Sequence, residues 1–126
     1  MLSDKPAQAT IAVKDISKAR KFYSDALGFK ELGGMGDSVA LFESGDSKIV
    51  VYKSEFAGTN KATSATWGVG DELEKIVRDL RSKSVTFEHY DMPGLERDGD
   101  IHVSGNFKAA WFKDPDGNIL HSNNQR

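Results

Sequence analysis

The sequence repeats one short pattern, because residues 10–15 read TIAVKD and residues 66–71 read TWGVGD, 56 positions later. Both stretches alternate as a half-buried strand does, and both end on Asp, a frequent helix N-cap residue. Apolar side chains recur at helical spacing after Asp15 and again after Asp71. We therefore expect a strand and an Asp-capped helix to occur twice, with Glu74 completing a capping box in the second copy.

A second repeat follows at a different offset. Residues 40–52, ALFESGDSKIVVY, align without gaps on residues 110–122, AWFKDPDGNILHS, at a shift of 70. Each copy predicts a β-hairpin, because Gly45-Asp46 and Asp116-Gly117 provide turn residues between two apolar strands. The difference between the two shifts leaves 14 extra residues in the second copy, within 88–107, which we expect to be a long loop with at most a short strand at each end.

The two repeats together predict an α+β fold of two βαβββ modules, about 8–56 and 64–124, within one domain over residues 1–126. The length of 126 residues suits one domain, and the 38% hydrophobic and 29% charged residues are typical of a globular chain. Tandem copies whose sheets each have one apolar face would bury those faces together.

The composition argues against several classes of partner. The net charge of −2, without a Lys/Arg-rich run, lacks the basic footprint that nucleic acid requires. The longest apolar runs, such as IVVY at 49–52, are far too short for a membrane span, and MLSDKPAQ at 1–8 has no apolar signal-peptide core, so we expect a cytoplasmic protein. The absence of cysteine excludes disulfides and a thiolate nucleophile.

Two stretches, VKDISKARKFYSDALGF at 13–29 and WFKDPDGNIL at 111–120, give the chain its family resemblance. It resembles the vicinal oxygen chelate superfamily, which includes glyoxalase I, extradiol dioxygenases and the fosfomycin- and bleomycin-resistance proteins. The resemblance covers nearly the whole chain. It implies an open, cup-shaped mixed sheet with helices outside, and commonly a homodimer with the cup at or near the interface.

The resemblance also implies where a divalent metal would bind. The ligand positions of the metalloenzymes fall on Gln8, Val51, Ser64 and His121. A catalytic metal site needs about three suitable protein ligands, usually His and carboxylate, and only His121 is of that kind. We therefore predict no metal and no cofactor at this site.

Strand alternation, combined with the resemblance, predicts which side chains line the cup. Trp67 is expected in the core, and Trp111 rather than Phe112 is expected in the cup. His121 alone is more often a hydrogen-bonded residue than a ligand, and His89 and His102 are expected in a solvated acidic loop. The predicted ligand-binding residues are Gln8, Thr10, Val51, Ser64, Thr66, Trp111 and His121.

The leading hypothesis is a metal-free protein that binds a small molecule in the cup, similar in principle to bleomycin-resistance proteins. The acidic residues of 88–107 favour a neutral or cationic ligand, which we expect to be aromatic or cationic. Three alternatives stay open: a divalent-metal-dependent lyase, isomerase or dioxygenase; a metal-free acid–base enzyme using His121; and a dimerisation module whose cup is filled by its own side chains.

Overall fold

The computed structural model describes residues 1–125, apart from the side chain of Met35. Arg126, the last residue of the expected domain, lies outside the described residues. The chain divides into two compact units, one of residues 1–60 with Pro115–Asn118 and one of Lys61–Asp114 with the C-terminal segment from Ile119. Each unit contains one copy of the repeat, so we describe each by itself.

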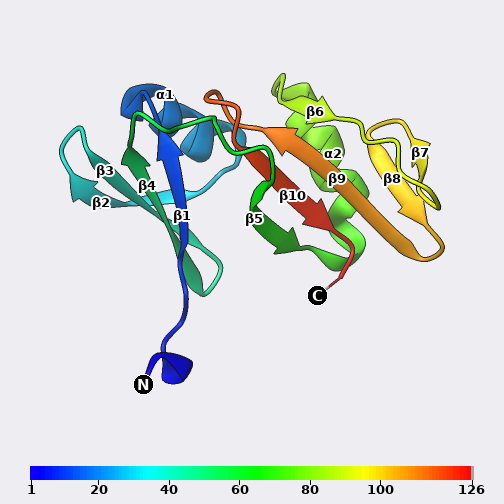
Figure 1. Cartoon of the computed structure of the whole chain (residues 1–126), viewed down its shortest axis with the longest axis horizontal. Helices are drawn as coiled ribbons and strands as arrows, with labels where there is room; N and C mark the ends of the chain where they lie inside the picture. The colour runs from blue at the N-terminus through cyan, green and yellow to red at the C-terminus, as the bar shows by residue number, and fades with distance from the viewer. Residues whose placement is uncertain (126) are drawn as a thin grey trace. The chain divides into compact units, whose positions relative to one another are not determined.

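The first unit is a βαβββ module (Figure 1). A 3-10 turn at Leu2–Asp4 precedes the module, whose helix α1 continues into a π-helical segment at Phe22–Ala26. The sheet order is β1-β4-β3-β2, with β1 parallel to β4 and the other pairs antiparallel. Its elements are β1 (Ala9–Val13), α1 (Ile16–Lys21), β2 (Lys30–Met35), β3 (Val39–Ser44) and β4 (Ser47–Lys53).

The second unit repeats this plan and adds a hairpin. Its sheet order is β5-β10-β9-β8-β7, with β6 also paired to β9, and β5 is parallel to β10. The expected α+β fold of two βαβββ modules is therefore confirmed. Its elements are β5 (Thr63–Gly68), a 3-10 turn (Gly70–Glu72), α2 (Leu73–Ser82), β6 (Thr86–Glu88), β7 (Glu96–Asp98), β8 (Ile101–Ser104), β9 (Phe107–Lys113) and β10 (Ile119–Asn123).

The hairpin β7–β8 corrects the expectation of a long loop at 88–107. Residues 96–98 pair with 101–103, and β8 extends the sheet by pairing with β9. The strands are too short for periodicity to reveal them, and their stability comes from pairing with β9, which lies later in the chain. Within 88–107, strand structure is absent from the segment 89–95 between β6 and β7 and from the two-residue turns at 99–100 and 105–106.

The two helices begin differently. The Asp15 side chain accepts a hydrogen bond from the Lys18 backbone N–H at 3.1 Å, which confirms the first predicted N-cap. The prediction for Asp71 is wrong, because this residue lies within a 3-10 turn and Glu72 occupies the N-cap position of α2. Glu74, expected in a capping box, instead accepts a hydrogen bond from Lys108 Nζ at 3.0 Å.

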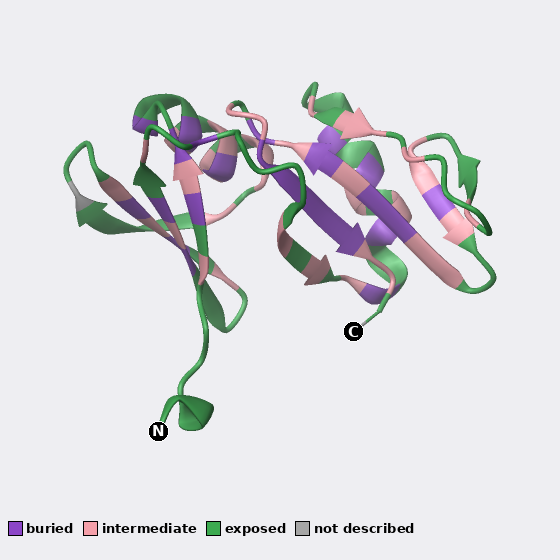
Figure 2. Cartoon of the chain, in the orientation of Figure 1, coloured by how far each residue is buried: buried purple, intermediate pink, exposed green. Residues whose placement is uncertain are grey.

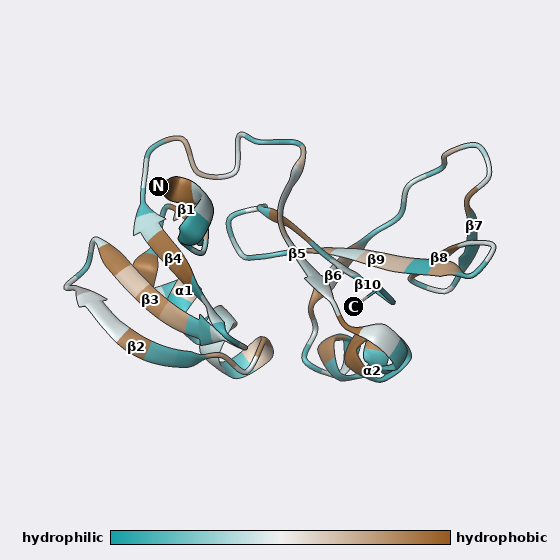
Figure 3. Cartoon of the chain, turned by 90° about the horizontal axis from the view of Figure 1, so that it is seen from below, coloured by the Kyte–Doolittle hydropathy of each residue, from teal (hydrophilic) through white to brown (hydrophobic). Residues whose placement is uncertain are grey.

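Each sheet packs one face against its own helix. In the first unit the Tyr23 ring lies 5.7 Å from the Phe42 ring, and both side chains are fully buried. Figure 2 marks the buried positions of the helices and strands in purple. In the second unit Leu73 and Val77 of α2 pack against Ala110, and Figure 3 shows the apolar positions of this helix. We call the opposite side of each sheet its helix-free face. Among residues 1–125, none of the helices has the length and apolar character that a membrane span requires.

Candidate functional site

The helix-free face of the second sheet brings together residues from three strands. His121 of β10 pairs with Trp111 of β9 on one side and with Thr66 of β5 on the other. Trp67 lies on the helix side, where its ring stacks on Phe112 at 6.4 Å. Ser64 alternates with Thr66, so it shares the helix-free face.

Four rings form a continuous group on this face, which we call the aromatic row: His121, Trp111, His102 and Tyr90. The Trp111 ring lies 4.5 Å from His121 and 4.8 Å from His102, between the two. Tyr90 stands edge-on to Trp111 at 5.2 Å and an interplanar angle of 83°. Trp111 therefore lies on the predicted face, and its neighbours there are the rings of the other three residues of the row.

His102 and Tyr90 were missed by sequence reasoning. We expected His102 in a solvated loop, but it is fully buried on β8, opposite Ala109 of β9. Its burial depends on the pairing of β8 with β9, and the sequence signal available was only the alternation of IHVS at 101–104. Tyr90 lies outside any strand and has no periodic pattern that places it over Trp111.

The imidazole of His121 is held in one neutral form. Its Nε2 lies 3.1 Å from Asn123 Nδ2, while Asn123 Oδ1 accepts the Gln125 backbone N–H at 3.0 Å. The amide orientation is therefore fixed, and Nδ2 donates to an unprotonated Nε2. Burial lowers the pKa of His121, and a proton on nearby His102 would lower it further.

His102 is also held neutral. Its Nε2 accepts the backbone N–H of Tyr90 at 2.9 Å, so that nitrogen carries no proton. Burial is the main cause that lowers the pKa of His102, and the positive charge of Arg97 adds to the effect. The site thus has two buried, uncharged imidazoles on either side of Trp111.

A more exposed polar cluster lies beside the row. His89 Nε2 is 2.6 Å from Asp100 Oδ1, and Arg81 Nη2 of α2 donates to Asp100 Oδ2 at 2.7 Å. Arg97 Nη1 is 3.0 Å from His89 Nδ1. Partial burial opposes ionisation of Asp100, but the hydrogen bonds from His89 and Arg81 hold its pKa below the ordinary value.

In the first unit the predicted residues do not gather in the same way. Gln8 is exposed and precedes β1, while Thr10 lies on the helix-free face opposite Val50. The prediction that Val51 faces the cup is wrong, because Val51 is fully buried on the helix side, two residues from Ile49 and paired with Ile11. Val50 and Tyr52 take the helix-free positions of β4.

The error has a specific cause in the second hairpin. Ala40 pairs with Val51, and its counterpart Ala110 pairs with Ser122, so the last strands correspond at a shift of 71 rather than 70. The second turn contains one residue more than the first. Because side chains alternate along a strand, this single residue moves the counterpart of His121 from Val51 to Val50.

The family assignment rests on residues 5–121, which match the model of the Glyoxalase/Bleomycin resistance protein/Dioxygenase superfamily. The chain belongs to this superfamily. The match spans both βαβββ modules, so it confirms the resemblance seen in the sequence.

Individual superfamily relatives are distant in sequence. The virulence protein STM3117 of Salmonella typhimurium strain LT2 is 25% identical over 127 residues, covering 95% of this chain and 83% of the relative. The fosfomycin resistance protein FosX of Listeria monocytogenes, in complex with Mn(II) and sulfate, has a TM-score of 0.72 and 15% identity, covering 96% and 90% of the two chains. Lactoylglutathione lyase of Agrobacterium tumefaciens has a TM-score of 0.69 and 13% identity, covering 94% and 92%.

The metal positions implied by the superfamily do not fit a metal in this chain. With the corrected register they are Gln8, Val50, Ser64 and His121, of which Val50 has no donor atom. Nε2 of His121 already accepts a hydrogen bond from Asn123, so its lone pair is not available to a metal. Within residues 1–125 there is no group of three or more His, Asp or Glu side chains that could hold a metal ion.

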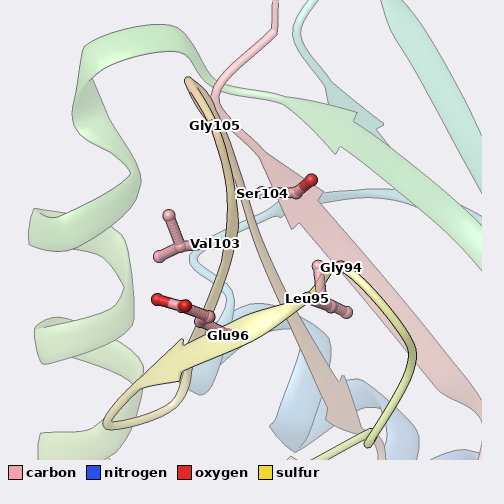
Figure 4. A pocket seen from close by; sticks show the side chains of 6 residues that line it. All are labelled: Gly94, Leu95, Glu96, Val103, Ser104 and Gly105. Atoms are coloured by element: carbon pink, nitrogen blue, oxygen red, sulfur yellow. The ribbon is translucent and has the colours of Figure 1, made fainter.

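A shallow depression of about 460 Å³ also lies on the β7–β8 hairpin. Figure 4 shows Val103 and Glu96 pointing to the α2 side of the hairpin. Val103 alternates with buried His102, so this depression does not belong to the aromatic row. Its lining residues are Gly94, Leu95, Glu96, Val103, Ser104 and Gly105.

Proposed function

We propose that this protein binds a small aromatic molecule, neutral or cationic, against the helix-free face of its second sheet, without a resident metal ion. The observation that carries the proposal is the aromatic row, in which half-buried Trp111 and Tyr90 present ring surface on the same face as Ser64 and Thr66, whose strand lies on the other side of His121. Apolar ring surface with a few polar groups is the usual composition of a small-molecule site.

The metal-free part of the proposal rests on the donors present. FosX is described in complex with Mn(II), and the superfamily includes dioxygenases. This chain has valine at one of the four corresponding positions, and Ser64 and Gln8 offer only neutral oxygens. His121 alone does not make up the three ligands that a catalytic metal site needs.

Charge supports the preference for neutral or cationic ligands. Glu88 pairs with Trp111 across β6 and β9, so its carboxylate lies on the same face as the row. Lys113 Nζ is 3.2 Å from this carboxylate and partly neutralises it. A planar cation would gain from the ring faces and from Glu88, whereas an anion would meet no unpaired basic group in the row.

The test uses the two tryptophans as separate probes. In Trp67→Phe only Trp111 remains, so binding of a planar compound should quench or shift the fluorescence. In the matched control Trp111→Phe only Trp67 remains, which is half-buried on the helix side of the sheet, and the same titration should leave the signal unchanged. A response of equal size in both variants would contradict binding at Trp111.

The metal-free part is tested separately by calorimetric titration of the purified protein with Mn²⁺, Ni²⁺, Zn²⁺ and Fe²⁺. We expect no stoichiometric binding. Tight binding of one ion that disappears in His121→Ala would overturn the proposal. It would instead support a metal-dependent lyase, isomerase or dioxygenase. Turnover of a ligand that is lost in His121→Gln, with binding kept, would instead indicate acid–base catalysis.

We further propose that the protein works as a homodimer. Tyr52 and Phe56 of the first unit are large apolar residues that are 37% and 77% exposed, and such residues are often covered in an assembly. Light scattering at micromolar concentration should give twice the mass of the chain, and Phe56→Ser should shift the equilibrium toward monomer. A monomer at all concentrations would contradict this part.

A further inference from the structure

All three histidines of the chain accept a hydrogen bond through one ring nitrogen. Arg97 Nη1 lies 3.0 Å from His89 Nδ1, the Tyr90 backbone N–H donates to His102 Nε2 at 2.9 Å, and Asn123 Nδ2 faces His121 Nε2. A guanidinium and a backbone N–H can only donate, so these ring nitrogens must be unprotonated. Each of these bonds exists only while its imidazole is neutral.

Two of the three bonds hold the same segment. Residues 89–95 connect β6 to β7, and their first two residues are His89 and Tyr90. His89 is tied to Arg97 of β7 and to Asp100 of the β7–β8 turn, and the Tyr90 amide is tied to His102 of β8. The start of the segment is therefore fixed to the hairpin through two imidazoles.

Protonation of His102 breaks its bond to the Tyr90 amide. A proton on His102 Nε2 removes the acceptor of the Tyr90 amide and places a charge in a fully buried position, near Arg97 and His89. His89 is tied to the hairpin differently, through the contact of its Nε2 with the carboxylate of Asp100, which also binds Arg81. Of the other groups around His102, the rings of Trp111 and Tyr90 and the backbone of Ala109 carry no charge, and the titratable group beyond Trp111 is the imidazole of His121.

We propose that His102 acts as an acid-sensitive clasp that fixes Tyr90, at the start of segment 89–95, at neutral pH and releases it when the imidazole is protonated. The Tyr90 ring stands 5.2 Å from Trp111, so release of the segment uncovers one side of that indole. If the proposed function is correct, the clasp controls access to the ligand face. The clasp itself does not depend on that function.

The test is amide hydrogen exchange, corrected for the intrinsic effect of pH, at pH 7.5 and pH 5.0 without any ligand. Protection of the Tyr90 amide should fall once the pH is below the pKa of His102, by about tenfold for each further pH unit, because the neutral fraction falls at that rate. Amides of β10 and α2 should keep their protection, which distinguishes local release from global unfolding. Unchanged protection at Tyr90 would overturn the clasp.

Two variants make the test specific. In His102→Gln the side-chain oxygen can still accept the Tyr90 amide but does not titrate, so the loss of protection at pH 5.0 should be much smaller. The matched control His121→Gln leaves the segment untouched and should respond to pH as the unchanged protein does. An equal loss of protection in both variants would contradict the role of His102.

A measurement on the unchanged protein covers the case in which His102→Gln fails to fold. The ring-proton shifts of His102 and the exchange of the Tyr90 amide are followed together through a pH titration. They should change with the same midpoint. Loss of amide protection while the His102 ring stays neutral would overturn the clasp, and because no ligand is present, neither result depends on the proposed binding function.

Discussion

Thr10 pairs with Val50 in the first unit as Thr66 pairs with His121 in the second, each across a parallel pair of strands. The two threonines are 56 residues apart, but their partners are 71 apart. The duplicated modules therefore keep the same parallel pairing although the second hairpin has a longer turn. His121 and Val50 face away from the helices, and Val51 faces α1.

This relationship predicts opposite results for two neighbouring substitutions. Val51→Asp places a carboxylate in a fully buried position without a partner, which should lower the free energy of unfolding by about 3 kcal/mol or more. Val50→Asp, at a half-buried position on the helix-free face, should lower the free energy of unfolding by clearly less. Urea unfolding of both variants measures the difference. A larger loss in Val50→Asp would mean that the register is wrong.

The sequence was sufficient for the modules but not for the register. Alternation in TIAVKD, the helical stripe after Asp15 and the turn residues of each hairpin are local signals, and they predicted β1, α1 and both hairpins. The length of the second turn was not visible, because the two segments align without gaps at 70 although the strands correspond at 71. A one-residue difference exchanges the two faces of a strand.

The candidate site was predictable only in part for a related reason. Trp111, His121 and Thr66 were placed on one face because they lie on strands whose alternation is clear. His102 was assigned to solvent because its burial arises from pairing with β9, a contact between strands that no local pattern shows. Tyr90 is fixed by one backbone hydrogen bond to His102, so it could be placed only after His102.

Stability should depend on pH in the range where the histidines titrate. His102 and His121 have lowered pKa values in the folded protein. Below the ordinary histidine pKa of about 6.5, the unfolded chain therefore binds more protons than the folded chain. The free energy of unfolding should be constant above about pH 7 and fall below pH 6.5, by at most about 1.4 kcal/mol per pH unit for each group. Urea unfolding at pH 7.5, 6.5 and 5.5 measures this slope.

The contribution of each imidazole can be separated. His102→Gln should remove about half of the slope between pH 6.5 and 5.5. The carboxylates Asp100 and Glu74 also have lowered pKa values, but they lose their stabilising effect only as the pH falls below their ordinary values near 4, so they do not disturb this range. A stability that is flat from pH 7.5 to 5.5 would contradict the neutral, buried state of both imidazoles.

Two glycines of the first unit with similar backbone angles should tolerate alanine differently. Gly58 has φ of 75°, and a Cβ there would clash with the backbone oxygen of Asp116. Gly28 has φ of 77°, but a Cβ would meet no atom within 4 Å. Gly28→Ala should cost about 1 kcal/mol for the left-handed conformation alone, whereas Gly58→Ala should cost roughly 2 kcal/mol more. Equal melting temperatures for the two variants would show that the approach of Gly58 to Asp116 is not a fixed contact.

The last prediction concerns the control of His121 by Asn123. Asn123 Nδ2 donates to His121 Nε2, and Asn123 Oδ1 accepts the Gln125 N–H, so Asn123→Asp keeps the second bond and turns the first donor into an acceptor. A carboxylate beside Nε2 favours the protonated ring, so the pKa of His121 should rise relative to that of the unchanged protein. A pH titration of the His121 ring by NMR measures the shift.

The matched control is Asn124→Asp. Asn124 makes its own bonds to Lys108 and Asn106, so this variant adds the same charge one residue away without replacing the donor to His121. Its effect on the His121 pKa should be small, because a charge without a direct hydrogen bond acts through a longer distance. If Asn123→Asp raised the pKa no more than Asn124→Asp, the amide would not be what keeps Nε2 unprotonated, and His121 would be available as a base.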